Sequence, residues 1–221
     1  MRLVLSLLAM LILTPIPPGG AAELSGRARV IDGDTLEIGN DRIRLHGIDA
    51  PETGQDCIDA TGRSYRCGVV ATRILSDLIG AGPVICTGDE RDKYGPLVAV
   101  CRKAGKDINA EMVRLGWARA FLRYSRDYAA LESDAETSRN GLWSGSFEAP
   151  WDLRHQRWQV SAVTAPLADC PIKGNISGNG RIYHTPYSRD YDRTKISPAK
   201  GERWFCSEAE ALAAGWRAPR Y

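Results

Sequence analysis

Histidines and closely spaced cysteines are scarce in this sequence. It has only three histidines, and none of its six cysteines forms a Cys-X-X-Cys pair. Tetrahedral zinc sites are built largely from such pairs and from histidine, so a structural zinc site is disfavoured. The formal net charge is also small, because 29 Lys and Arg stand against 27 Asp and Glu, which gives +2. Binding to a polyanion would therefore have to come from local placement of basic residues and not from a large overall field.

Long apolar runs are absent after the first residues of the chain. The sequence begins MRLVLSLLAMLILTPIPPGGAAE, in which Arg2 precedes an apolar run and the small pair Ala21-Ala22 follows a break rich in proline and glycine. This pattern is typical of a secretory signal peptide over residues 1–22, and an uncleaved anchor is the alternative. We therefore expect a mature chain that is soluble, secreted or periplasmic, and free of the membrane.

The six cysteines predict disulfides, because an exported chain folds in an oxidising compartment. Sequence alone leaves many pairings open, but the spacing favours partners that are neighbours along the chain. The predicted disulfides are Cys57–Cys67, Cys86–Cys101 and Cys170–Cys206. Metal ligation by Cys170, His184 and Cys206 is the alternative to the third.

The pattern of short alternating and amphipathic segments predicts a small barrel with helices. Strand-like alternation occurs over residues 26–31, 34–38, 42–48, 83–87 and 97–101. Helical spacing of apolar residues occurs over 68–79, 108–115 and 127–139. Three strands, a helix, two strands and two helices are typical of an OB-fold, a five-stranded β-barrel, here with three α-helices packed on it.

The composition changes after about Pro150. Gly, Ser, Asn, Tyr and Pro become frequent, until a last helical pattern over residues 207–215. The WFC segment and the Gly/Asn turns of this part resemble a small extension called a sunset domain. We divide the chain into a signal peptide, a barrel domain, a linker and a small disulfide-pinned module, over residues 1–22, 23–150, 151–164 and 165–221.

Three polar motifs follow one another in the barrel segment. They are IDGDT at 31–35, RLHGIDAPE at 44–52 and RDKYG at 91–95. Each alone is explained by a tight turn or by solvated charges at a strand end. Together with INAEMVRLGWA and a helix ending in GLW, they resemble the staphylococcal nuclease (thermonuclease) family from about Gly26 to Trp143. The resemblance implies an endonuclease that hydrolyses phosphodiester bonds of DNA, RNA or both with low sequence specificity.

The same resemblance implies a calcium site. Its ligands would be the carboxylates of Asp34 and Asp49 and the main-chain carbonyl of Ala50, with water completing the shell. These are the hard oxygen donors that calcium prefers. Asp32 would be a nearby acid, and its role as a turn former is an equal alternative.

Two further residues of the RLHGIDAPE motif are implied to be catalytic. Glu52 would be the general base that activates or orients the attacking water. Arg44 would bind the phosphate with both arms of its guanidinium and stabilise the transition state. A surface ion pair between charged residues is the alternative for both.

Nucleotide contacts are implied for Lys93, Tyr94 and Tyr124. Lysine pairs with phosphate, and a tyrosine ring stacks on a base without reading the sequence. The alternative for either tyrosine is a half-buried residue that packs against the protein. We expect a monomer.

One position departs from the family pattern. A second catalytic arginine is expected after the tyrosine and glycine of DKYG, and Pro96 stands there. Proline carries no charge and donates no hydrogen bond. The sequence therefore predicts a nuclease whose activity is weakened. The alternative is a catalytically impaired envelope protein that binds nucleic acid or another anionic polymer.

Overall fold

The computed structural model describes residues 21–92, 95–167 and 169–219. The predicted signal peptide, except Ala21 and Ala22, lies outside these residues. Within them, no helix is long and apolar enough to cross a bilayer.

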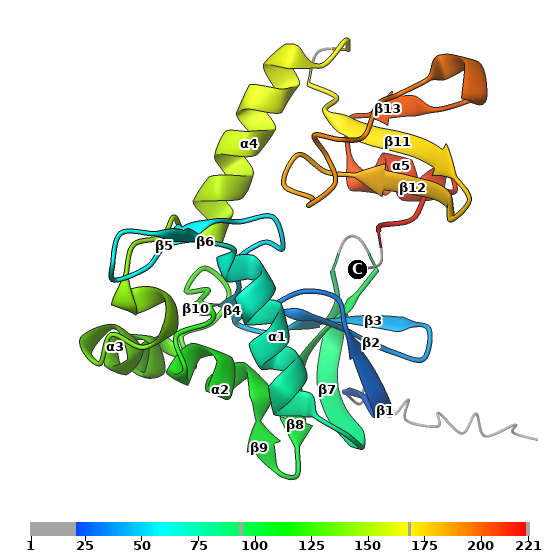
Figure 1. The fold of residues 1–221 in the computed structure, drawn as a ribbon. Coiled ribbons are helices and arrows are strands. Elements are labelled where there is room, and N and C mark those ends of the chain that lie inside the picture. Colours follow the sequence, from blue (N-terminus) through cyan, green and yellow to red (C-terminus); the bar gives the residue numbers. More distant parts are fainter. Residues whose placement is uncertain (1–20, 93–94, 168, 220–221) are drawn as a thin grey trace, which may run out of the picture.

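A closed five-stranded barrel forms the first part of the chain (Figure 1). Its strands are β1 (Ala22–Val30), β2 (Thr35–Ile38), β3 (Asp41–Leu45), β7 (Pro83–Arg91) and β8 (Leu97–Lys103). Antiparallel pairs join β3 to β2, β2 to β1, β1 to β7 and β7 to β8. A parallel pair between β3 and β8 then closes the barrel. The predicted OB-fold is confirmed.

Helices cover the barrel and complete its core. They are α1 (Cys67–Ile79), α2 (Ile108–Arg114), α3 (Ala129–Thr137) and the 3-10 turn η1 (Gly141–Ser144). Helix α2 begins at the predicted residue, because the Asp107 side chain accepts a hydrogen bond from the Ala110 N–H at 3.0 Å. Leu36, Ile43, Leu75 and Met112 are fully buried between barrel and helices. Burial of this apolar surface is the main favourable term in the folding of the domain.

Short strands lie at the turns between these elements. They are β4 (Ile48–Asp49), β5 (Cys57–Ile58), β6 (Ser64–Tyr65), β9 (Lys106–Asp107) and β10 (Arg119–Ala120). β10 pairs with β4, β5 with β6, and β9 with the end of β8, all antiparallel. The β4–β10 pair matters most for the site, because it holds Asp49 against the segment after α2.

The segment between the barrel and the C-terminal module is a helix. Residues 151–164 were predicted as a linker, and they lie in α4 (Pro150–Thr164), which has proline in its first turn. The hydrophobic face of α4 is weak, since only Pro150 is buried in it, and this explains why the sequence pattern did not reveal the helix. The division into domains stays a prediction.

The C-terminal module is a three-stranded antiparallel sheet with one helix. Strands β11 (Ile172–Ser177), β12 (Gly180–His184) and β13 (Arg203–Phe205) have the order β12-β11-β13. The 3-10 turn η2 (Pro198–Lys200) and helix α5 (Glu208–Ala213) complete it. Ser207 caps α5, because its side chain accepts a hydrogen bond from the Glu210 N–H.

All three predicted disulfides are formed, Cys57–Cys67, Cys86–Cys101 and Cys170–Cys206. The alternative in which Cys170 and Cys206 ligate a metal is therefore wrong for this state of the chain. The first disulfide joins the β5 strand to the start of α1, and the second links neighbouring barrel strands.

Candidate active site

A cleft of about 920 Å³ lies between the barrel, helix α4 and the C-terminal module. The barrel contributes the carboxylates of two motifs, α4 contributes Arg154, and the module contributes polar and aromatic side chains. In Figure 1, α4 leads away from the barrel and the module returns toward the side where β2 and β3 lie. Among the residues lining the cleft are Asp32, Asp34, Arg44, Asp49, Ala50, Glu52, Tyr124, Arg154, Tyr183, Tyr187 and Glu208.

The IDGDT turn is packed directly against the RLHGIDAPE motif. The Ala50 N–H donates a hydrogen bond of 3.0 Å to Asp34 Oδ2, and the Asp34 N–H donates one of 3.1 Å to Asp32 Oδ1. A Cβ atom on Gly33 would lie 2.6 Å from the Ala50 Cβ, so only glycine permits this approach. Two of the predicted calcium ligands, Asp34 and Ala50, are thus in contact.

Asp49 is fixed by the pairing of β4 with β10. It lies opposite Arg119, and the residue is only 4% exposed. Glu132 of α3 accepts from the Ala120 N–H at 3.1 Å and from the Arg119 side chain. Glu132 therefore ties α3 to the strand beside Asp49.

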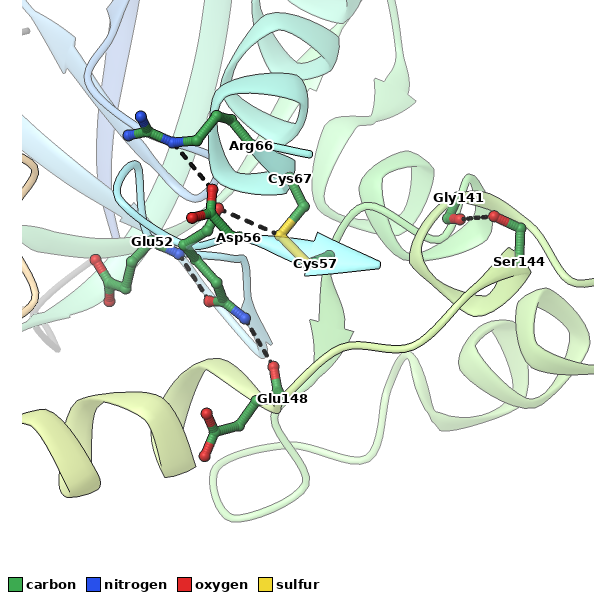
Figure 2. The surroundings of a disulfide bond; sticks show 9 residues. Glu52, Asp56, Cys57, Arg66, Cys67, Gly141, Ser144 and Glu148 are labelled. Carbon is green, nitrogen blue, oxygen red and sulfur yellow. Dashed lines mark hydrogen bonds and ion pairs between the residues drawn. A yellow bond between two sulfur atoms is a disulfide. The ribbon is translucent and has the colours of Figure 1, made fainter. Parts of the chain in front are cut away.

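The loop that carries Glu52 is held from two sides. A Cβ on Gly68, at the start of α1, would lie 1.7 Å from the Glu52 carbonyl oxygen, so the loop packs against α1 at a position that only glycine permits. The buried side chain of Gln55 accepts from the Glu52 N–H at 3.2 Å and donates to the Glu148 carbonyl at 2.8 Å. Figure 2 shows Glu52 and Glu148 at the two ends of this link, beside the Cys57–Cys67 disulfide. The Glu52 loop and the residues that precede α4 are therefore bonded through one amide.

Arg154 joins the predicted metal ligand to the predicted base. Its Nη1 donates to Asp49 Oδ1 at 3.0 Å and to Glu52 Oε1 at 2.7 Å, and its Nη2 donates to Asp49 Oδ2 at 2.5 Å. Sequence reasoning missed this residue. Its one signal was its place in a stretch rich in tryptophan and arginine, and a contact across about a hundred residues leaves no local pattern.

Arg44 lies at the other side of the carboxylates. Its Nη1 is 3.2 Å from Asp92 Oδ2, and half of the side chain is exposed to the cleft. Burial would lower the pKa of Arg44, but the charges of Asp34, Asp92 and Asp32 outweigh that effect and raise it. The guanidinium is therefore charged throughout the accessible pH range, and it lines the cleft while it is paired with Asp92.

Burial raises the pKa values of three carboxyl groups of the cleft. The pKa of Asp32 rises to about 7, with a further contribution from the charge of Asp34. Burial raises the pKa of Asp49 to about 6 and that of Glu52 to about 8, although Arg154 lowers both. Each of these groups would be stabilised in its charged form by an added cation.

The donor set of the cleft fits a calcium ion. Asp34 and Asp49 supply anionic oxygens, the Asp34 charge raises the pKa of Asp49, and the Ala50 main chain lies beside Asp34. Hard oxygen donors with excess negative charge are what calcium prefers. No group of three or more His, Cys, Asp or Glu side chains that could hold a metal is found among the described residues. The expected set requires only two carboxylates, with a carbonyl and water.

The predicted nucleotide contacts are only partly visible. Tyr124 lines the cleft and is 73% exposed, and it stacks at a tilt on Phe121 with ring centroids 5.0 Å apart. Lys93 and Tyr94 lie outside the described residues. Pro96 is buried and is not among the described residues that line the cleft.

The C-terminal module forms a second wall that sequence reasoning did not foresee. Glu208 accepts hydrogen bonds from the Tyr183 hydroxyl at 2.8 Å and from the Tyr187 hydroxyl at 3.2 Å. Its charge reaches Arg44, and it is one of the causes that raise the Arg44 pKa. This wall therefore adds negative charge opposite a predicted phosphate-binding residue.

Comparison with known proteins assigns the barrel. The model of the family described as staphylococcal nuclease homologue matches residues 42–145. An uncharacterized endonuclease of Escherichia coli O157:H7 is 34% identical over 145 residues, which are 62% of this chain and 88% of the relative. The chain belongs to the staphylococcal nuclease family. The family membership that the sequence motifs of the barrel predicted is therefore confirmed.

Two other relatives of this nuclease-family chain carry different names. A micrococcal nuclease of Shigella flexneri is 33% identical over 144 residues, which are 57% of this chain and 77% of the relative. The succinoglycan biosynthesis protein ExoI of Rhizobium meliloti (strain 1021) is 37% identical over 150 residues, 64% of this chain and 75% of the relative. A second family model, described as ArfC, matches residues 160–218. The likeness of the module to a sunset domain stays a prediction.

Proposed function

We propose that this chain is an exported, calcium-dependent endonuclease that hydrolyses phosphodiester bonds of DNA and RNA with low sequence specificity. The observation that carries the proposal is the convergence of Asp34, Asp49, Glu52 and Arg44 on one cleft. Family membership and the relatives named for endonuclease or nuclease activity support it. The disulfides and the N-terminal sequence pattern support export.

Each side chain has a role in this reaction. Glu52 takes a proton from the attacking water. Burial raises the pKa of Glu52, and a cation held beside it would favour the charged form that accepts the proton. Arg44 binds the phosphate and stabilises the charge that develops on it. Water oxygen bonds to phosphorus in line, the bond from phosphorus to the 5′ oxygen breaks, and the 5′ oxygen takes a proton from solvent. The products have 3′-phosphate ends.

Asp34, Asp49 and the Ala50 carbonyl would hold the calcium ion. A bound ion would supply positive charge next to the phosphate oxygens. The cleft needs such charge, because its described acidic side chains outnumber its arginines and would repel a nucleotide. Tyr124 offers a face on which a base can stack, a contact that does not depend on sequence.

The proposal is tested by cleavage of labelled single-stranded DNA and RNA by the natively oxidised mature chain. Cleavage should need calcium, stop with a chelator and leave 3′-phosphate ends. Asp34→Asn and Asp49→Asn should each weaken calcium binding strongly, which calorimetry measures directly. Unchanged calcium affinity in both variants would exclude these ligands.

A second candidate is a protein that binds nucleic acid without cutting it. Pro96 favours this candidate, because no guanidinium follows Gly95. The ion pair between Arg154 and Glu52 favours it too, since it occupies the predicted base. This second candidate is favoured if the natural chain binds oligonucleotides in a calcium-dependent way but neither it nor the Pro96→Arg variant cleaves them.

A further inference from the structure

Arg154 comes from outside the segment that the nuclease family model matches. That match ends at residue 145, whereas Arg154 is on α4. Its side chain is 28% exposed, and the Asp49 and Glu52 side chains that it binds are 5% and 19% exposed. The ion pair is therefore largely shielded from water, and all three side chains line the cleft.

Helix α4 is attached to the barrel near this ion pair. The Trp151 ring stacks on Phe121 with centroids 5.5 Å apart, and the Arg119 guanidinium lies 5.1 Å from the Trp151 centroid. The Gln55 amide bonds the Glu52 main chain to the Glu148 carbonyl, just before α4 begins (Figure 2). Arg154 is thus set beside the carboxylates by packing of aromatic rings and by a buried amide, and its long side chain is the part that can move.

Arg154 and a cation would use the same oxygen atoms. Both carboxylate oxygens of Asp49 accept hydrogen bonds from Arg154, and Asp49 is one of the two carboxylates that the proposed function gives to calcium. Two positive groups cannot both take the best positions on one carboxylate. When Asp49 binds a cation, Arg154 loses its strongest partner, and its guanidinium becomes available for another anion.

A guanidinium released at this point has a suitable new partner. A phosphodiester bound between Arg44 and the calcium ligands would lie next to Arg154, because Asp49 and Glu52 line the same cleft. Guanidinium and phosphate form paired, charge-assisted hydrogen bonds. We propose that Arg154 is an exchangeable counter-ion. It binds Asp49 and Glu52 in the empty cleft, and it binds the substrate phosphate once Asp49 holds a cation.

This inference rests on the proposed function and deepens it. It assigns to α4, a segment beyond the nuclease barrel, a phosphate-binding residue of the same site. It also predicts two effects of opposite sign for one substitution. Loss of Arg154 should strengthen cation binding and weaken phosphate binding, whereas a merely structural ion pair predicts neither.

The experiment measures two affinities by calorimetry at pH 8 on the natively oxidised mature chain. The first is the affinity for calcium alone, and the second is the affinity for a nucleoside 3′,5′-bisphosphate in saturating calcium. The variants are Arg154→Met, Arg154→Lys and, as matched control, Arg157→Met. Arg157 is one turn further along α4 and is not among the described residues that line the cleft.

Arg154→Met should bind calcium on the order of tenfold more tightly and the bisphosphate on the order of tenfold more weakly, as expected for losing hydrogen bonds between charged groups. Arg157→Met should change neither affinity. Arg154→Lys keeps the charge but not the paired geometry, so its calcium affinity should stay near that of the natural chain and its bisphosphate affinity should fall. Lysine also serves if the methionine variant does not fold.

Three results separate the possible failures. If Arg154→Met and Arg154→Lys leave bisphosphate affinity unchanged while the natural chain binds calcium and cleaves, the exchange is refuted and the proposed function stands. If Arg154→Met, shown to be folded by its circular dichroism, binds calcium more weakly, Arg154 supports the metal site and the competition is refuted. If the natural chain binds neither calcium nor the bisphosphate, the proposed function fails and the inference fails with it.

Discussion

The two walls of the cleft differ in how they are built. On the barrel wall, Asp34, Asp49 and Glu52 come from two motifs that lie close together in the sequence, and main-chain hydrogen bonds and close glycine contacts hold them. On the other wall, Arg154, Tyr183 and Glu208 come from α4 and the C-terminal module. The barrel wall carries the groups to which the proposed function gives the chemistry. The opposite wall changes the charge around those groups.

The modules behind these walls also differ in how they are stabilised. The barrel has a large apolar core that includes Leu36, Ile43 and Leu75. The buried apolar cluster of the C-terminal module is small and consists of Ile172, Tyr183, Phe205, Ala211 and Trp216. A small core supplies little stability, and such modules usually depend on disulfides. The second wall should therefore be easier to disturb than the first.

The largest effect is expected on the barrel wall. Glu52→Gln keeps the shape of the side chain but removes the proton acceptor, so cleavage should fall by about 10²–10⁴-fold. The rate of calcium-dependent oligonucleotide cleavage measures this. Glu208→Gln, the same change on the opposite wall, is the control and should keep activity. Equal losses in the two variants would mean that the walls do not differ in chemical role.

Removal of the module disulfide comes next. Cys170 and Cys206 are 36 residues apart, whereas Cys86 and Cys101 are 15 apart. Chain-entropy estimates give a loss of roughly 3–5 kcal/mol for loops of such lengths. Replacing Cys170 and Cys206 by serine should unfold the module first, while the barrel keeps its structure. Limited proteolysis and thermal melts would show this, and a single cooperative loss of both modules would contradict it.

Pro96→Arg compares the two sources of a second guanidinium. The sequence alone predicts a large gain of activity, since a guanidinium that acts on a transferring phosphate is worth about 10³–10⁵-fold in other phosphoryl-transfer enzymes. If Arg154 already binds the phosphate, the gain in the natural chain should be less than about tenfold. Pro96→Arg should then raise activity mainly when it is added to the Arg154→Met variant, which lacks the other guanidinium. Cleavage rates of both single variants and the double variant decide between the two expectations.

The smallest effect is expected from the charge of Glu208. Tyr183 and Tyr187 donate to different oxygens of Glu208, so Glu208→Gln keeps one acceptor, and its amide N–H can donate to the other hydroxyl oxygen. The change removes a negative charge that acts on Arg44. Exposed charge pairs are typically worth about 0.2–1 kcal/mol, so bisphosphate affinity should rise by a factor between roughly 1.4 and 5. Calorimetry in saturating calcium measures it, and raised salt should reduce the difference. A fall in affinity would show that the second wall supports the nucleotide directly.

The sequence by itself predicted the barrel and one wall of its cleft. Alternation of apolar residues located the five strands, and helical spacing located α1, α2 and α3 to within about two residues. The motif RLHGIDAPE places Arg44, Asp49 and Glu52 within nine positions, so a short strand and a turn suffice to bring them together. Local patterns carry such information, because alternation and turn chemistry depend on neighbouring residues.

Only the tertiary structure decided which residues face that wall. Helix α4 buries little apolar surface, so its sequence lacks the periodicity that identifies a helix. Arg154 donates a hydrogen bond to Asp49, which lies 105 positions earlier in the sequence. The charge of Glu208, in the C-terminal module, helps to raise the pKa of Arg44 in the barrel. An ion pair of this kind is set by the packing of Trp151 on Phe121 and by the Gln55 amide. Such contacts follow from how whole elements pack, because no local preference of the chain relates residues so far apart in sequence.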